Sequence, residues 1–404
     1  MAKFRPYSPE QAWLLPPSVQ DVLGAEHLSF FVHEVVERLD LGRLEASYGE
    51  AGQPGYHPKL LLKLWLYAYC LGVTSSRRLE QRTREDLGFR YLAGGAQPDH
   101  WTLNSFRQRH ARGLNDAFTQ VVEFARQQGC ARLGHVAIDS TRIAANASPD
   151  SVASEQSLRQ ERERIRRQIR NWQKQCEQES PQESGGTEVD ARLRRRLDAI
   201  PGQLQRLRKT GMAKQSKTDP DSRFLRQRGG FVLGYTAEIA VTEDHWIVAQ
   251  RVTQATHDRD SFNAVLDDLE KRCQSVPGQA SADSGYYTSD QIEAANQRGV
   301  DCYVPDCNLA HELHGGPRAE QIDGCVQQHR GVLEEMRRKL RSAAGRLVYQ
   351  KRKAMVEPVF GVLKEQRNGR RFRLRGLPRV AIEFCLMTLA FNVTRLYHNR
   401  PHPA

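Results

Sequence analysis

The chain has 404 residues, a formal net charge of +12 and 39% hydrophobic residues. This length suggests about two or three domains, and the composition excludes global disorder and a small disulfide-stapled scaffold. The chain has eight scattered cysteines, no apolar core of a signal peptide and no apolar run long enough to span a bilayer. These features predict a cytoplasmic protein without membrane contact.

Residues 1–130 are predicted to form a helical domain. Pro58 is expected to open a helix that Gly72 ends, because proline favours the first turn and glycine the position after the last. An arginine-rich helix follows over residues 75–86, and after a glycine turn Thr102 is expected to cap one long helix. Short helices with arginines around a glycine turn predict a helix-turn-helix DNA-binding domain, with a structural helical bundle as the alternative.

Residues 131–404 are predicted to form a mixed α/β domain, because strand signals interleave with helices. A short apolar strand begins at Val136, and Asp139 is expected to interrupt it. Residues 234–256 alternate in polarity around an acidic turn, which predicts an antiparallel hairpin. Further helices and strands are expected over residues 260–273, 280–285, 289–298 and 300–305.

Residues 150–230 are predicted to be a helical hairpin inserted into this domain. Apolar residues keep near-heptad spacing in two arms, with a loop over residues 181–186 between them. Pro201 and Gly202 are expected to kink or divide the second arm. The apolar positions are Leu158, Ile165, Ile169, Trp172, Cys176, Leu193, Leu197, Ile200, Leu204 and Leu207.

The positive charge is concentrated in residues 331–380, which carry 15 Lys and Arg against 4 Asp and Glu. This concentration favours a polyanionic partner, because Lys and Arg gain affinity by releasing the counterions of phosphates. A solvated basic face without a ligand is the alternative.

Three carboxylates stand out by their context. Asp139 follows an apolar strand, Asp283 lies where a strand gives way to a glycine turn, and Glu357 lies within the basic stretch. Each one alone is also explained as a cap or turn residue. Together they suit phosphodiester cleavage, since two divalent ions held by hard oxygen ligands activate the attacking oxygen and stabilise the leaving one.

The chain resembles the DDE transposases of bacterial insertion sequences, in the branch with a helical N-terminal domain and a YREK-type signature. Single motifs of this kind are weak, but their order along nearly the whole chain is specific. The matching segments are GYHPKLLLKLWLYAYCLGVTSSRRLEQ, PDHWTLNSFRQRH, AIDSTRIAANAS, TDPDSRF, ADSGYY, and YQKRKAMVEPVFGVLK followed by RRFRLRGLPRVAIEFCLMTLAFNVTRL.

The resemblance implies a ribonuclease H-like catalytic core that cleaves element ends with two Mg²⁺ or Mn²⁺ ions. The freed 3′-hydroxyl would then be joined to target DNA without a covalent protein intermediate. At matching positions, Asp139, Asp283 and Glu357 correspond to the three metal-binding acids. The companions of the signature, expected near the DNA backbone, are Tyr349, Arg352 and Lys364.

The signature is altered at its arginine. The family places three residues between the arginine and the glutamate, whereas Arg352 has four and Lys353 has three before Glu357. On a continuous helix Lys353 shares a face with Glu357 and Arg352 lies off it, which favours Lys353 as the phosphate contact. Pro358 disfavours a helical Glu357, so a kink at this point is also expected.

Two other groups of side chains have both a functional and an ordinary explanation. Tyr286 and its neighbour Tyr287 can stack on bases at a cut end, with core packing as the alternative. A zinc site is possible from spacing, although a free thiol in a core strand explains the first cysteine equally well. Its ligands would be Cys302, Cys307, Cys325 and His329.

The implied partners are double-stranded DNA, as terminal inverted repeats and as target, and a second copy of the chain. A homodimer is expected because two element ends must be held in one synaptic complex, and the protein would be associated with the bacterial nucleoid. Two alternatives remain: a catalytically inactive or domesticated DNA-binding relative, and a ribonuclease H-like nuclease without strand transfer.

Overall fold

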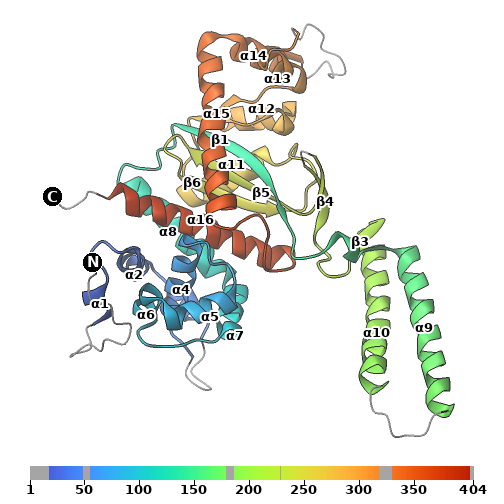
Figure 1. Ribbon diagram of the computed structural model, residues 1–404. Coiled ribbons are helices and arrows are strands. Elements are labelled where there is room, and N and C mark those ends of the chain that lie inside the picture. The colour runs from blue at the N-terminus through green and yellow to red at the C-terminus, as the bar shows by residue number, and fades with distance from the viewer. Residues whose placement is uncertain (1–17, 49–54, 179–185, 228, 318–329, 401–404) are drawn as a thin grey trace, which may run out of the picture. The chain divides into compact units, whose positions relative to one another are not determined.

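Figure 1 shows the computed structural model, which describes residues 18–48, 55–178, 186–227, 229–317 and 330–400. The chain forms two compact units, one of residues 1–121 with 389–404 and one of residues 122–388. The described residues 389–400 therefore group with the N-terminal unit, whereas a catalytic domain of residues 131–404 was predicted to include them. Helices α8 (Ala111–Gln127) and α16 (Leu377–Asn399) each contribute to both units.

The first unit is helical throughout its described residues, as predicted. Helix α4 is nearly all buried, and Nε1 of its Trp65 donates to the carbonyl of Leu103 (2.8 Å). Pro58 is the first residue of α4, and Gly72 after its end has a φ of 69°. The other helices are α1 (Val19–Val22), α2 (Leu28–Arg38), α3 (Gly42–Glu45), α4 (Pro58–Cys70), α5 (Ser76–Glu85), α6 (Leu87–Ala93) and α7 (His100–Arg109).

The long helix expected after Thr102 is two helices. The N-cap of α7 is Asp99, whose carboxylate accepts from the N–H of Thr102 (2.7 Å), so Thr102 is the third helical residue. His110 has a ψ of 41° and ends α7, and α8 begins at the next residue. The expected cap was wrong because both residue types suit an N-cap and the aspartate lies three positions earlier.

The second unit is built on a mixed sheet in the order β4-β5-β1-β7-β8, with β6 also paired to β5. Strand β5 is antiparallel to β1, β4 and β6, whereas β1, β7 and β8 are parallel. The predicted hairpin is β5 with β6. The strands are β1 (His135–Ala144), β4 (Arg223–Gln227), β5 (Gly230–Thr242), β6 (Ile247–Thr253), β7 (Gln279–Ser281) and β8 (Asp301–Tyr303).

Strand β1 does not end at Asp139, contrary to the prediction. Asp139 pairs with Ile239 of β5 in a ladder that runs from Val136 to Ala144. The strand tolerates the carboxylate because its charge is paired with an arginine, which offsets part of the cost of burying it.

Helices cover the sheet. Helix α11 packs on β6 and β5, and α15 packs on β1 and its neighbours. A five-residue π-helical turn (Val362–Gln366) follows α15, and a 3₁₀ turn (Ser284–Tyr286) follows β7. The helices are α11 (Phe262–Cys273), α12 (Ser289–Gln297), α13 (Cys307–Leu313), α14 (Arg330–Arg341) and α15 (Ala343–Gly361).

The insertion is a hairpin of two helices, as predicted. Helices α9 (Glu155–Gln178) and α10 (Gly186–Thr210) lie side by side (Figure 1), with the paired strands β2 (Val152–Ser154) and β3 (Lys214–Ser216) at their base. Helix α10 continues through Pro201, so the arm is not divided. Most of the expected loop lies outside the described residues. The buried seam consists of Ala153, Leu158, Ile165, Ile169, Ile200, Leu204 and Leu207.

The segment TDPDSRF connects the insertion to helix α16. Asp219 is fully buried and accepts from the hydroxyl of Tyr235 (2.7 Å) and from the N–H of Gly376 (3.0 Å). Asp221 accepts from the N–H of Leu377, the first residue of α16 (2.8 Å). These carboxylates satisfy donors at a helix start, which otherwise lack partners. Helix α16 has the length and hydropathy of a membrane span, but 78% of its most apolar window is buried, as in a core helix.

Candidate active site

Asp139 lies in the middle of β1, with its side chain 18% exposed. Its Oδ1 accepts from the N–H of Ser140 (2.7 Å), and its Oδ2 accepts from the guanidinium of Arg352 (3.0 Å). Burial raises the pKa of Asp139 to about 6; the positive charge of Arg352 opposes this rise, and the negative charge of Asp283 adds to it. The carboxyl is therefore in a shielded place where a neighbouring cation stabilises its charged form.

Asp283 is brought beside Asp139 by the parallel pairing of β1 and β7. Ala280 of β7 lies opposite Val136 of β1, so the two aspartates occupy equivalent positions three residues further along. Burial raises the pKa of Asp283, and the positive charge of Arg352 opposes the rise. The two predicted acids thus share one electrostatic environment.

Arg352 is the basic side chain next to these acids. It lies on α15 with its side chain 8% exposed, and its guanidinium carbon is 5.8 Å from the ring centroid of Tyr349. Lys353 is exposed, and its Nζ lies 3.4 Å from Nε2 of His314. Arg352 lies off the helix face of Glu357, as expected, but it is Arg352 and not Lys353 that contacts Asp139. The face that α15 turns inward is set by its apolar residues, which are Met355, Val356 and Val359.

A pocket of about 280 Å³ adjoins Arg352. Three basic side chains line it, those of Arg346, Arg352 and Lys353. The end of α13 contributes Glu312, Leu313 and His314. Burial raises the pKa of Tyr349, another lining residue, so its hydroxyl remains protonated at neutral pH and can donate a hydrogen bond. The carboxylate of Glu312 also lines the pocket, but it is paired with Arg341 (2.7 Å), so the three cations and the hydroxyl donor suit an anionic group such as a phosphate.

Two further carboxylates near the aspartates were not predicted. Asp258 accepts from both terminal nitrogens of Arg142 (3.2 and 3.1 Å) and from the hydroxyl of Ser140 (3.0 Å), and its charge raises the pKa of Asp283. Glu238 is fully buried opposite Ser140, and burial raises its pKa. The hydroxyl and guanidinium that follow Asp139 in the sequence were the available signal for an acidic partner.

Glu357 is not joined to the two aspartates. It is exposed on α15, which continues through Pro358, and it follows Arg352 by about 140° around the helix. Among the described residues, no three His, Cys, Asp or Glu side chains lie close enough to hold one metal ion. The oxygens of Asp139 and Asp283 are donors that suit Mg²⁺, so the structure brings together two of the three proposed ligands.

Lys364 lies in the π-helical turn that follows α15. Burial lowers its pKa, and so does the positive charge of Arg370, whereas the negative charge of Asp139 raises it. Lys364 is therefore within electrostatic reach of Asp139. Single π-helical turns within helices are often found at functional sites.

Of the two groups of side chains with alternative explanations, Tyr286 follows the core-packing alternative, and the zinc site stays a prediction. Tyr286 has no exposed surface, and a fully buried ring cannot stack on a base. Cys302 is buried in β8, where burial raises the pKa of its thiol to about 12, as expected for a free packed cysteine. Cys307 is exposed, and the other two proposed zinc ligands, Cys325 and His329, lie outside the described residues.

Two family models match the chain. Residues 18–109 match a transposase domain (DUF772), and residues 288–397 match a transposase DDE domain. The first match spans helices α1 to α7, and the second extends from α12 into α16 and includes Arg352 and Glu357. No curated protein and no solved structure matches the chain.

Proposed function

The chain belongs to the DDE transposases of insertion sequences and has their ribonuclease H-like core, and we propose that it cleaves and joins DNA at the ends of such an element. The substrates are double-stranded terminal inverted repeats and target DNA. The proposed reaction has two steps: hydrolysis of a phosphodiester at the element end, and attack of the freed 3′-hydroxyl on the target strand.

The proposal rests chiefly on one observation, the juxtaposition of Asp139 and Asp283 on neighbouring parallel strands. Burial raises the pKa values of both carboxyls, so their charged forms lower the stability of the folded protein. Groups of this kind are concentrated at functional sites. The basic pocket beside Arg352 supports a polyanionic substrate at the same place.

Asp139, Asp283 and Glu357 are the proposed ligands of two Mg²⁺ or Mn²⁺ ions. When bound, these ions supply the activation of the attacking oxygen and the stabilisation of the leaving one. Glu357 is exposed on α15 and would have to be brought to the two aspartates for all three to hold the ions together.

The basic side chains around the acids are proposed to hold the scissile strand. Arg352 and Lys353 line the pocket, and Lys364 lies within electrostatic reach of Asp139. Arg352 donates a hydrogen bond to Asp139. If its guanidinium turned to a phosphate instead, the carboxylate of Asp139 would be available to a metal ion. Tyr349 is placed to donate to the same phosphate group.

The N-terminal unit is proposed to bind the inverted repeats. Arg77 and Arg78 on α5 are exposed and have no carboxylate partner among the described residues. Trp101 on α7 is 70% exposed, an unusual position for a large apolar ring without a partner. These side chains offer phosphate contacts and an apolar contact on neighbouring helices.

The experiment is to incubate the purified protein with a labelled duplex of the element end, a target plasmid and Mg²⁺. We expect labelled ends joined to the plasmid. Cut ends without joined products would indicate a nuclease without strand transfer, and binding without cleavage would indicate an inactive relative.

A further inference from the structure

The hairpin arm α10 carries a row of positive charges that the proposed reaction does not use. Arg192, Arg195, Arg206 and Lys209, here called the α10 basic stripe, are all exposed. At about 100° per residue these four positions fall within about 100° of one another, and they span about 25 Å along the helix. The stripe therefore consists of two pairs of cations on one edge of the helix, and the exposed Asp198 lies beside the gap between them.

The cations of this stripe lack acidic partners. None of the four forms an ion pair with a carboxylate among the described residues, and Arg195 donates only to the backbone carbonyl of Ala191 (3.2 Å). In the first half of α9, by contrast, Glu155 pairs with Arg159 (2.6 Å) and Glu163 pairs with Arg166 (3.1 Å). Alternating charges of this kind are typical of a solvated face, whereas cations without acidic partners repel one another until an anion neutralises them.

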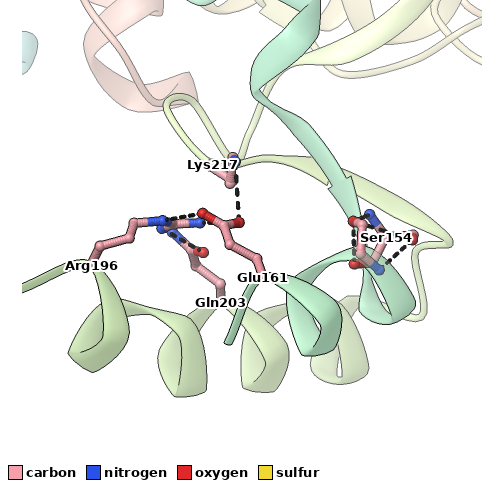
Figure 2. A network of polar contacts seen from close by, with 6 residues as sticks. Ser154, Glu161, Arg196, Gln203 and Lys217 are labelled. Atoms are coloured by element: carbon pink, nitrogen blue, oxygen red, sulfur yellow. Dashed lines mark hydrogen bonds and ion pairs between the residues drawn. The ribbon is translucent and has the colours of Figure 1, made fainter. Parts of the chain in front are cut away.

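The stripe is held on a rigid support. Figure 2 shows Glu161 of α9 accepting from Arg196 of α10 (2.8 and 2.9 Å) and from Lys217 (3.3 Å), while Gln203 accepts from the same arginine (3.0 Å). Arg196 lies one turn after Arg192, so this network is next to the stripe and its only carboxylate is already neutralised. Together with the apolar seam, it fixes the two arms in register.

The middle of the stripe is open to close approach. Between its two pairs of cations the same helix edge carries Ala199 and Gly202. A side chain added at Gly202 would meet nothing within 4 Å. A bulky partner can therefore contact the helix backbone here while the cations on both sides bind the partner.

We propose that the α10 basic stripe binds the phosphate backbone of duplex DNA, independently of base sequence. This inference deepens the proposed function and rests on it, since it assigns a second DNA contact to the insertion. Phosphates are the fitting partner because the stripe offers charge without apolar surface, and because its length approaches the ~34 Å of one turn of B-DNA.

The test compares two triple variants of the full-length protein. The stripe variant carries Arg192→Gln, Arg206→Gln and Lys209→Gln, and the control carries Arg159→Gln, Arg162→Gln and Arg166→Gln, which remove three cations of α9 that pair with carboxylates. Binding of a labelled duplex of unrelated sequence is measured without metal over a range of salt concentrations.

We expect the stripe variant to bind roughly tenfold or more weakly, and its salt slope to fall by about 2 to 3, which is the release lost with three phosphate contacts. The control should bind within about twofold of the wild type. Equal losses in both variants would mean unspecific attraction to a basic protein and would overturn the proposal, as would an unchanged stripe variant.

A second pair of variants separates the effect of charge on DNA binding from the effect of side-chain size. Gly202→Glu places a negative charge in the stripe, and Gly202→Gln places a neutral group of the same size there. We expect Gly202→Glu to weaken binding severalfold more than Gly202→Gln, with equal circular dichroism for both. Equal binding by the two variants would overturn the proposal.

Failure of this inference differs from failure of the proposed function. A wild type that joins ends, with a stripe variant that binds DNA normally, overturns the stripe alone. A wild type that binds duplex through the stripe but never cuts an element end overturns the reaction and leaves the stripe standing.

Discussion

Arg352 and Asp139 each neutralise a charge that would otherwise be held alone in a shielded place. Their side chains are 8% and 18% exposed, and the Nη1 to Oδ2 distance is 3.0 Å. Removing one partner of such a pair leaves the other charge unpaired, which costs more than the pair itself contributes. Arg352 therefore has a structural role in the DNA-free protein in addition to its proposed contact with phosphate.

Arg352→Gln should lower the free energy of unfolding by about 3 kcal/mol in metal-free buffer. Lys353→Gln, the matched exposed control, should change it by less than about 0.5 kcal/mol. Urea unfolding of both variants at neutral pH measures the difference. Equal effects of the two substitutions would contradict the assignment of Arg352 to the buried pair.

The raised pKa of Asp139 predicts a pH-dependent stability. The folded state holds this proton up to about pH 6, whereas the unfolded chain releases it near pH 4, so the contribution of Asp139 to stability falls as the pH rises between these values. Unfolding of the wild type and of Asp139→Asn should be compared across this window without metal. The wild type should lose stability relative to the variant as pH rises, and a constant difference would argue against the raised pKa.

At the residue scale, the sequence predicted a shared site for the two aspartates, which the structure brings to neighbouring strands, but it did not predict the contact of Arg352 with Asp139. Asp139 and Asp283 each lie near a strand, and the resemblance assigned both of them. Selecting Arg352 over Lys353 needs the rotation of α15 about its axis, which depends on how its apolar residues pack against the sheet. Spacing to Glu357 carries no information about that packing.

Among the elements, the hairpin arms depend on the half-buried network around Glu161. Its pKa is lowered, chiefly by the hydrogen bond from Arg196, so its stabilising effect is present above the unfolded pKa near 4 and is lost as pH falls through the lower folded value. Glu161→Gln should lower the free energy needed to open α9 and α10 by about 1 to 2 kcal/mol at pH 7.

Hydrogen exchange of the α9 and α10 amides measures this opening. The difference between the wild type and Glu161→Gln should shrink as the pH is lowered below 4. A difference that is the same at pH 7 and pH 3 would show that the charge of Glu161 does not hold the arms together.

The start of α16 depends on Asp219. Asp219→Ala leaves the hydroxyl of Tyr235 and the N–H of Gly376 without their acceptor, at a cost of about 2 to 4 kcal/mol for two buried donors. Adding Tyr235→Phe removes one of these donors and should recover part of the loss. Chemical unfolding of the single and double variants tests this, and additive losses in the double variant would contradict the shared contact.

At the scale of elements, apolar period and turn residues predicted the helical hairpin and the β5-β6 pair. The errors came from local choices that the period does not decide. Asp99 and Thr102 are both good N-caps, and α10 accommodates Pro201 because the seam on either side of it holds the helix. The parallel pairing of β1 with β7 joins segments far apart in the chain, and no local pattern shows it.

In the whole molecule, the excess of positive over negative charge is concentrated in two regions. Residues 331–380 carry 15 Lys and Arg against 4 Asp and Glu, and helices α9 and α10 carry 14 against 7. These excesses together exceed the net charge of +12, so the remainder of the chain is net negative. Duplex binding should accordingly weaken steeply with salt, and most of that dependence should come from these two regions.

The central claim is that Asp139, Asp283 and Glu357 act together on DNA with a divalent metal. The most direct measurement is Mg²⁺-dependent cleavage of a labelled element end by Asp139→Asn, Asp283→Asn and Glu357→Gln, with Glu365→Gln as the control, since Glu365 is also exposed and pairs only with Arg370 among the described residues. Each of the three should lose cleavage by about a thousandfold or more while end binding stays within about threefold, and the control should cut as the wild type does. Full cleavage by any one of the three would contradict the account.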